Sequence, residues 1–176
     1  MKRLFFPLLL LLMTSPAFAQ IHAQIFVHPA HGFEIQLPPD WERRTEGMEP
    51  VVLYAMSNLD NQEDPFRENV SVALNSTKGK TREEFLALSK ESLKVSFPEM
   101  KMEHEESRVV NGVEMTMWVY TYQANALQLK AKTFLMLLSD TGYAITCTGT
   151  TETFAEYEAL FSKITASFQF KAKGQR

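Results

Sequence analysis

The stretch from residue 107 to residue 150 alternates apolar and polar side chains in runs that short turn signals separate. This period of two is typical of half-buried strands, which we expect over 107–110, 113–122, 127–138 and 143–150. The turn signals are Asn111-Gly112, a short polar loop around Asn125, and Asp140-Thr141-Gly142. Strands joined by hairpins run antiparallel, so this meander predicts a largely antiparallel sheet.

Two amphipathic helices are expected on either side of the meander. Thr81-Arg82-Glu83-Glu84 has the pattern of a capping box, and the apolar residues that follow keep helical spacing as far as Pro98. A second helix opens in the same way at Thr153-Phe154-Ala155-Glu156. Further strands are expected over 25–28, 33–37, 51–56 and 70–75. Each helix must bury its apolar stripe on a sheet face. The fold class predicted is therefore α+β, a central antiparallel sheet flanked by helices in an α/β/α sandwich.

The first nineteen residues have the pattern of a cleavable export signal. Lys2 and Arg3 precede an apolar run, and Ala17-Phe18-Ala19 matches the small-x-small cleavage site. No Cys follows the run, so the lipid-anchored form of such a signal is not indicated. We expect residues 1–19 to be a signal peptide, residues 20–176 to form a single domain without a membrane span, and the protein to be periplasmic or secreted.

The charge balance of the mature chain argues against nucleic acid as a partner. The signal contains two of the 18 Lys and Arg residues and no acidic residue, which leaves 16 basic against 21 acidic side chains. Nucleic-acid and anionic-membrane sites need clustered positive charge. The single Cys, Cys147, alternates with Tyr143 and Ile145 on the apolar side of its strand, opposite a side of threonines. It is therefore interpreted as a buried structural thiol.

The segment Gly32-Phe33-Glu34-Ile35-Gln36-Leu37-Pro38-Pro39-Asp40-Trp41 resembles the N-terminal signature of PsbP-like proteins. The capped helix after the third strand, Asn111-Gly112 before the long hairpin, Tyr143-Ala144-Ile145-Thr146, and Ala166-Ser167-Phe168 at the end of the last helix are also similar. The resemblance covers roughly residues 25–170 and is closest to the exported bacterial DcrB-like branch. It implies a PsbP-like sandwich and a non-enzymatic role in binding another macromolecule.

No motif in the sequence predicts catalysis or a cofactor. There is no Gly-x-Ser-x-Gly elbow, no His-Glu-x-x-His and no phosphate-binding glycine-rich loop. His28 and His31, with His22 nearby, are the one weak candidate for zinc or copper, and two imidazoles in a turn fall short of a complete ligand set. The alternative reading is a solvated turn. We expect neither an enzyme nor a metal site.

The hairpin of residues 113–138 carries the best candidate for a binding surface. Met115, Met117 and Val119 share one face of the first strand, and Trp118, Tyr120 and Tyr122 share the other. Lys130 on the partner strand is expected to join the aromatic face. Aromatic rings beside cations are enriched in protein interfaces. Trp118, Tyr120, Tyr122 and Lys130 would then line a groove for a partner or small ligand, with Tyr122 the most exposed ring. In the alternative, a helix covers these rings and they belong to the hydrophobic core.

Two functions follow from these features. The first is an exported, non-enzymatic accessory protein that binds a protein partner in the cell envelope. The second is a periplasmic carrier of a small ligand or metal that uses the aromatic face or the histidines.

Overall fold

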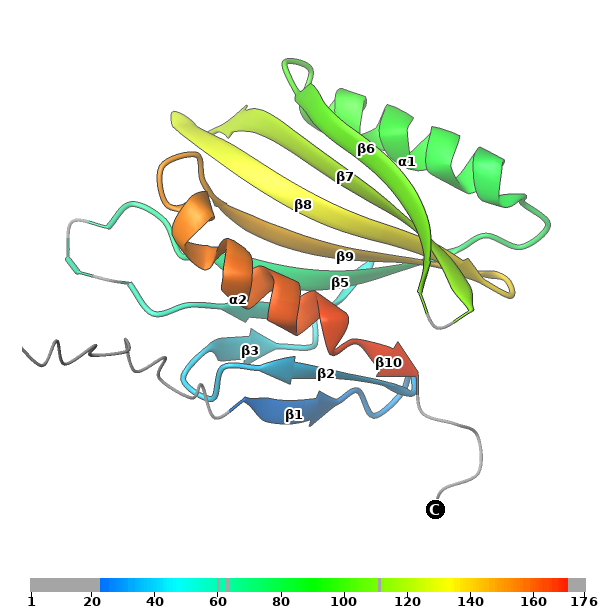
Figure 1. The fold of residues 1–176 in the computed structure, drawn as a ribbon, viewed down its shortest axis with the longest axis horizontal. Helices are drawn as coiled ribbons and strands as arrows, with labels where there is room; N and C mark the ends of the chain where they lie inside the picture. The colour runs from blue at the N-terminus through cyan, green and yellow to red at the C-terminus, as the bar shows by residue number, and fades with distance from the viewer. Residues whose placement is uncertain (1–22, 60, 63, 111, 171–176) are drawn as a thin grey trace, which may run out of the picture.

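A seven-stranded antiparallel sheet is the central layer of the computed structural model, which describes residues 23–59, 61–62, 64–110 and 112–170 (Figure 1). The strands in spatial order are β3 (Glu42–Arg44), β4 (Val51–Met56), β5 (Asn69–Ser76), β9 (Thr141–Thr150), β8 (Leu127–Leu138), β7 (Val113–Ala124) and β6 (Lys101–Val110). The antiparallel sheet predicted from the hairpin signals is confirmed. The expected signal peptide, His22 and Asn111 lie outside the described residues.

The two faces of this sheet are covered by different elements. Helix α1 (Arg82–Ser96) lies on one face, here named the α1 face, over β7 and β8. Helix α2 (Phe154–Ala166) lies on the opposite α2 face (Figure 1). A second sheet, in the order β1 (Gln24–Val27), β2 (Phe33–Leu37) and β10 (Gln169–Phe170), continues the layer of α2. The flanking helices confirm the predicted sandwich, and the small sheet is an addition to it.

The core is divided between the two faces by the alternation of the strands. On the α2 face, Phe33, Ile145 and Cys147 are fully buried together with Phe161 of α2. On the α1 face, Phe85 of the helix packs with Trp118, Tyr120, Ala131 and Leu135. The alternation also puts Met115 and Met117 on the α2 face, opposite the aromatic residues, as the sequence predicts. Burial of these apolar side chains is the main stabilising contribution to such a sandwich.

The first predicted capping box is present and the second is not. The Thr81 hydroxyl accepts from the Glu84 N–H at 3.2 Å, and the Glu84 carboxylate accepts from the Thr81 N–H at 2.8 Å. At α2, Thr153 has helical dihedral angles and its side chain makes no cap hydrogen bond. Its hydroxyl instead donates to the carboxylate of Glu68, which is buried beside β9. The prediction for α2 was wrong because a tertiary contact competes for the hydroxyl.

Two strands have no signal in the sequence. Strand β3 reads Glu-Arg-Arg and β10 has only two residues, so neither shows apolar alternation. Both exist because a neighbouring strand supplies hydrogen-bonding partners: β4 pairs with β3, and β2 pairs with β10. Within the described residues, no helix is both long and apolar enough to span a membrane.

Candidate functional site

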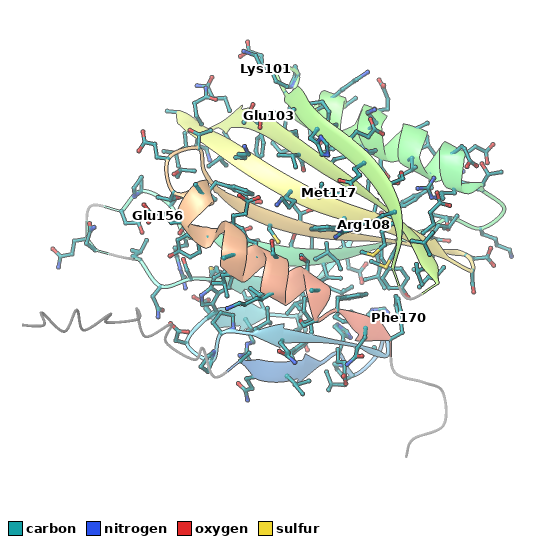
Figure 2. The ribbon with its side chains drawn as sticks, viewed as in Figure 1. Lys101, Glu103, Arg108, Met117, Glu156 and Phe170 are labelled. Carbon is teal, nitrogen blue, oxygen red and sulfur yellow. The ribbon has the colours of Figure 1, made fainter. Side chains whose placement is uncertain are left out.

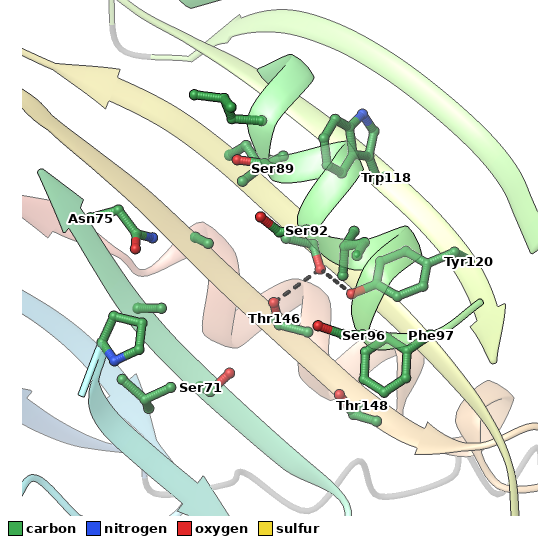
Figure 3. Close-up of a pocket in the computed structure, with 18 of the residues that line it drawn as sticks. Ser71, Asn75, Ser89, Ser92, Ser96, Phe97, Trp118, Tyr120, Thr146 and Thr148 are labelled. Atoms are coloured by element: carbon green, nitrogen blue, oxygen red, sulfur yellow. Dashed lines mark hydrogen bonds between the residues drawn. The ribbon is translucent and has the colours of Figure 1, made fainter. Parts of the chain in front are cut away.

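A groove with a volume of about 760 Å³ lies on the α1 face, between α1 and the part of the sheet that the helix leaves uncovered. We call it the α1 groove. Leu88, Ser89, Ser92 and Ser96 of α1 form one wall, and its floor consists of small side chains of β5 and β9 (Figure 3). Those floor residues are Ser71, Ala73, Asn75, Ala144, Thr146 and Thr148. The groove exists because a single helix is narrower than a seven-stranded sheet.

Helix α1 approaches the sheet closely at Gly142 of β9. A Cβ atom on Gly142 would lie 2.4 Å from Cε2 of Phe85, whose ring is buried. Gly142 has no positive φ and lies inside β9, so it is needed for the approach of the ring and not for the turn predicted there. The turn between β8 and β9 instead uses Ser139, at φ 53°. The contact fixes the depth of the groove wall.

Trp118 lies behind α1 and is 1% exposed. Its indole N–H donates to Oε1 of Glu105 at 3.0 Å, and Nζ of Lys90 donates to the other carboxylate oxygen at 2.7 Å. Lys90 also lies 5.5 Å from the centroid of the indole ring. The hydrogen bond from Lys90, with that from Trp118, lowers the pKa of Glu105. Trp118 therefore supports the wall from behind and offers almost no surface to an occupant.

Tyr120 is buried and anchors a chain of hydroxyl groups across the sheet. Its hydroxyl is 3.1 Å from Oγ1 of Thr133, which is 2.9 Å from Oγ1 of Thr146 on the groove floor (Figure 3). Burial raises the pKa of Tyr120. The network satisfies these polar groups within the protein and holds the floor in place.

Tyr122 is the most exposed of the three predicted rings. It is half-buried, and its ring centroid lies 4.1 Å from that of Phe97 at the end of α1. Burial, with the neighbouring Tyr120, raises the pKa of Tyr122 to about 12. Phe97, Tyr122 and half-exposed Leu88 thus present the accessible apolar surface of the groove.

Lys130 lies on the opposite face from the aromatic residues, which corrects the prediction. Asn125 and Ala126 form a two-residue turn with φ 50° and 69°, so Tyr122 pairs with Leu129 and Lys130 pairs with Thr121. Directly paired residues point to the same side of a sheet. Lys130 accordingly forms an ion pair with Glu103 at 2.8 Å and lies over the Phe154 ring of α2.

The polar lining of the α1 groove was missed by sequence reasoning. Among the described residues, the hydroxyls of Ser71, Ser89, Ser92 and Ser96 and the amide of Asn75 have no hydrogen-bond partner, so they are available to an occupant. Two features of the sequence could have indicated this polar lining. One is the threonine side of the last strand, and the other is the spacing of three and four residues between the serines of α1. Lys80 is the one charged residue among the described residues of the lining, and no acidic residue contributes to it.

The histidines serve the turn between β1 and β2. His28 is buried, its Nε2 lies 3.1 Å from the carbonyl oxygen of Val52, and its Nδ1 accepts from the N–H groups of Ala30 and His31 at 3.3 Å. Burial lowers the pKa of His28. With both nitrogens engaged, His28 has no lone pair free for a metal. In the described part of the chain, no three His, Cys, Asp or Glu side chains gather into a metal site.

Comparison with known protein families gives a match over most of the chain. The model described as "Serine/threonine kinase C-terminal domain" matches residues 26–170, from β1 to β10. The chain belongs to this family. The region shared with the serine/threonine kinase C-terminal domain family therefore includes the whole α1 groove. No curated protein matches the chain.

Solved structures with the same fold come from several bacteria. The solution structure of cyanobacterial PsbP (CyanoP) from Synechocystis sp. PCC 6803 has a TM-score of 0.65 at 13% identity, covering 90% of this chain and 98% of CyanoP. LpqN, involved in cell envelope biogenesis of Mycobacterium tuberculosis, has a TM-score of 0.66 at 12% identity, with 86% and 92% covered. PA94 from Pseudomonas aeruginosa, a protein of unknown function, has a TM-score of 0.60 at 12% identity, with 86% and 99% covered.

At such low identity, these likenesses establish the fold and carry no function with them. The PsbP-like fold predicted from the sequence is confirmed. The family model that matches has a different description from the resembled family, and the DcrB-like branch stays a prediction.

Proposed function

We propose that the mature chain is an exported, non-catalytic accessory protein of the cell envelope that binds a partner protein through the α1 groove. The observation that carries this proposal is the apolar surface that Leu88, Phe97 and Tyr122 present beside an uncovered sheet floor. Concave apolar and aromatic surface of this kind is typical of the central part of protein interfaces. Because Lys80 is the one charged side chain in the described lining, the segment that fits is apolar and carries no acidic cluster.

Export and the envelope setting are supported by the predicted signal peptide and by the neighbours. LpqN, which shares the fold, is involved in cell envelope biogenesis. The matched family is described as the C-terminal domain of a serine/threonine kinase, which is a module accompanying a catalytic domain. Both descriptions are compatible with a binding module that acts beside other proteins. We propose that this chain is such a module and that it belongs to the DcrB-like branch.

A non-catalytic role is supported by the state of the reactive side chains. Cys147 is fully buried and burial raises its thiol pKa, whereas a nucleophilic thiolate needs a lowered pKa and access. Both nitrogens of His28 are engaged in the turn. General acid–base catalysis needs a titratable group within reach of the substrate, and the α1 groove is lined mainly by hydroxyls and apolar groups.

Site-specific photo-crosslinking tests the proposal with a matched pair of positions on one helix. Leu88 is 50% exposed and lines the groove, whereas Val95 is 74% exposed on the same helix and lies outside the lining. A benzophenone amino acid at each position, in the mature chain exported in its native host, should crosslink a defined envelope protein from position 88 and not from position 95.

Substitution then tests whether the groove contributes affinity for the captured protein. Leu88→Asp should weaken binding at least about fivefold, because an interface side chain that matters contributes more than about 1 kcal/mol. Val95→Asp should leave the affinity unchanged. Equal crosslinking from both positions, or no crosslinked protein, would refute the proposal.

A second candidate function is a carrier for a small neutral ligand, which the groove dimensions favour. A volume of about 760 Å³ is within the roughly 300–1,000 Å³ of small-molecule sites, and hydroxyls without a partner among the described residues lie on the α1 wall and on the floor. Thermal-shift screening separates the two functions, because a ligand that binds only the native state raises the melting temperature. A neutral ligand whose stabilising effect is abolished by Leu88→Asp would establish the carrier and displace the partner-protein proposal.

A further inference from the structure

A second groove, of about 650 Å³, lies on the α2 face and is independent of the α1 groove. Met115, Met117 and Met136 line it together with Phe134 of β8, Phe168, and Phe170 of β10. We call it the methionine groove. Figure 2 shows Met117 and Arg108 in the space between β6 and α2, with Phe170 toward the end of α2.

The apolar wall of the methionine groove is suited to a flexible chain. Met115 pairs directly with Met136 across β7 and β8, and Met117 lies two residues along on the same face. Met115 and Met117 are half-buried, so their thioethers are both packed on the core and accessible. Methionine side chains are unbranched and polarizable, and they adapt to irregular apolar ligands more readily than branched side chains.

Among the described residues that line the methionine groove, the charged ones are Lys132 and Arg108, and both are cations. Lys132 has 12% of its side chain exposed and is already paired with Glu158, at 2.6 Å. Arg108 is exposed and has no ion pair within the described chain. The carboxylate on the same face of β6, Glu106, lies 3.4 Å from Nε2 of His104. Within the part of the chain that the structure describes, the guanidinium of Arg108 at the edge of this apolar groove therefore has no anionic partner.

We propose that the methionine groove binds a long-chain fatty carboxylate, with the alkyl chain along Met115 and Met117 and the carboxylate on Arg108. The planar guanidinium can donate two parallel hydrogen bonds to the two oxygens of a single carboxylate. A phosphomonoester headgroup carries nearly two negative charges and would draw further cations, whereas the described lining offers, besides Arg108, only Lys132, which is already paired with Glu158. The proposal does not depend on the function of the α1 groove, since the two sites lie on opposite faces of the sheet.

Calorimetric titration of the mature chain with dodecanoate, below its micelle concentration, is the first test. We expect saturable binding with one site. Decanoate should bind more weakly by up to about fifteenfold, because each methylene transferred out of water contributes about fourfold in affinity. Dodecyltrimethylammonium has an alkyl chain one methylene longer and a positive head, and it should still bind at least about tenfold more weakly than dodecanoate because it cannot make the contact to Arg108.

Two variants on the same strand identify the headgroup site. Arg108→Gln should weaken dodecanoate binding about tenfold, the loss expected for a hydrogen bond to a charged group. Lys101→Gln removes another exposed cation, at the far end of β6 and outside the groove, and should change the affinity by less than about twofold (Figure 2). Both residues are exposed, so both variants are expected to fold.

Methionine methyl NMR locates the bound chain. With ¹³C-labelled methyl groups, dodecanoate should shift the signals of Met115, Met117 and Met136. The signals of Met100 and Met102, which pack with the core on the α1 face, should stay unchanged. The proposal is overturned if dodecanoate does not bind or if Arg108→Gln has no effect. It is also overturned if the cationic amphiphile binds as tightly, or if Met100 and Met102 shift instead. Binding to phosphatidylglycerol vesicles without binding to dodecanoate would likewise reject it.

Discussion

The contact between Gly142 and Phe85 should control both the stability of the protein and the seating of α1. An Ala Cβ at position 142 would lie 2.4, 2.6 and 2.9 Å from three ring atoms of Phe85, well inside van der Waals contact. Overpacking of this kind costs about 1–3 kcal/mol, against which Ala gains about 0.5–1 kcal/mol over Gly in a strand. We expect Gly142→Ala to lower the free energy of unfolding by about 1–2 kcal/mol.

A double-mutant cycle tests whether that loss comes from the ring. Leu at position 85 lacks the Cε2 and Cζ atoms that make the two shortest contacts, so Phe85→Leu should relieve the clash. The free energies of unfolding, from urea denaturation followed by circular dichroism, should be non-additive by about 1 kcal/mol in favour of the double variant. Gly149→Ala is the matched control in β9, because its Cβ would lie 3.4 Å from the nearest atoms, and we expect little change. Additive effects, or a Gly142→Ala variant as stable as the parent, would refute this account of α1.

Other residues give predictions that need a single measurement each. The pKa of Tyr122 is raised from 10.0 to about 12, so this residue stabilises the fold below pH 10 and the contribution is lost as the pH rises from 10 to 12. Tyr122→Phe should therefore make the free energy of unfolding, measured by urea denaturation, decline less over this pH range. The Cys147 thiol should resist a chromogenic disulfide reagent in the native state and react in denaturing urea, whereas prompt native reaction would contradict its burial. Zinc should leave the melting temperature unchanged at neutral pH, because both nitrogens of His28 are engaged; a rise that His28→Gln abolishes would show otherwise. Thr81→Ala should reduce stability by about 0.5–2 kcal/mol through loss of the α1 cap.

Most of the sheet could be predicted from the sequence because its strands are long and half-buried. The pair β7 and β8 was expected over 113–122 and 127–138, and the structure has Val113–Ala124 and Leu127–Leu138. Alternation also separated Met115 and Met117 from the aromatic residues correctly. In such strands the alternation of apolar and polar residues matches the buried and exposed faces of the sheet, so the alternation is sufficient to predict the strand.

The errors arose where a tertiary contact decides the outcome. The face of Lys130 depends on whether the turn at Asn125 has an even or odd number of residues, which the polar composition of the loop does not fix. Thr153 has the residue type of a helix cap, but its hydroxyl donates instead to buried Glu68, which lies in the loop just before β5. Gly142 has the appearance of a turn residue, and its role lies in packing against a helix far along the chain. The α1 groove itself depends on where α1 rests on the sheet, which no local pattern encodes.

Strand β7 contributes to both the α1 groove and the methionine groove: even-numbered positions, such as Tyr120, face α1, and odd-numbered positions, such as Met117, face α2. Inserting or deleting a single amino acid there would exchange the two linings at once. Neither surface can therefore be remodelled by changing the length of that strand without destroying the other.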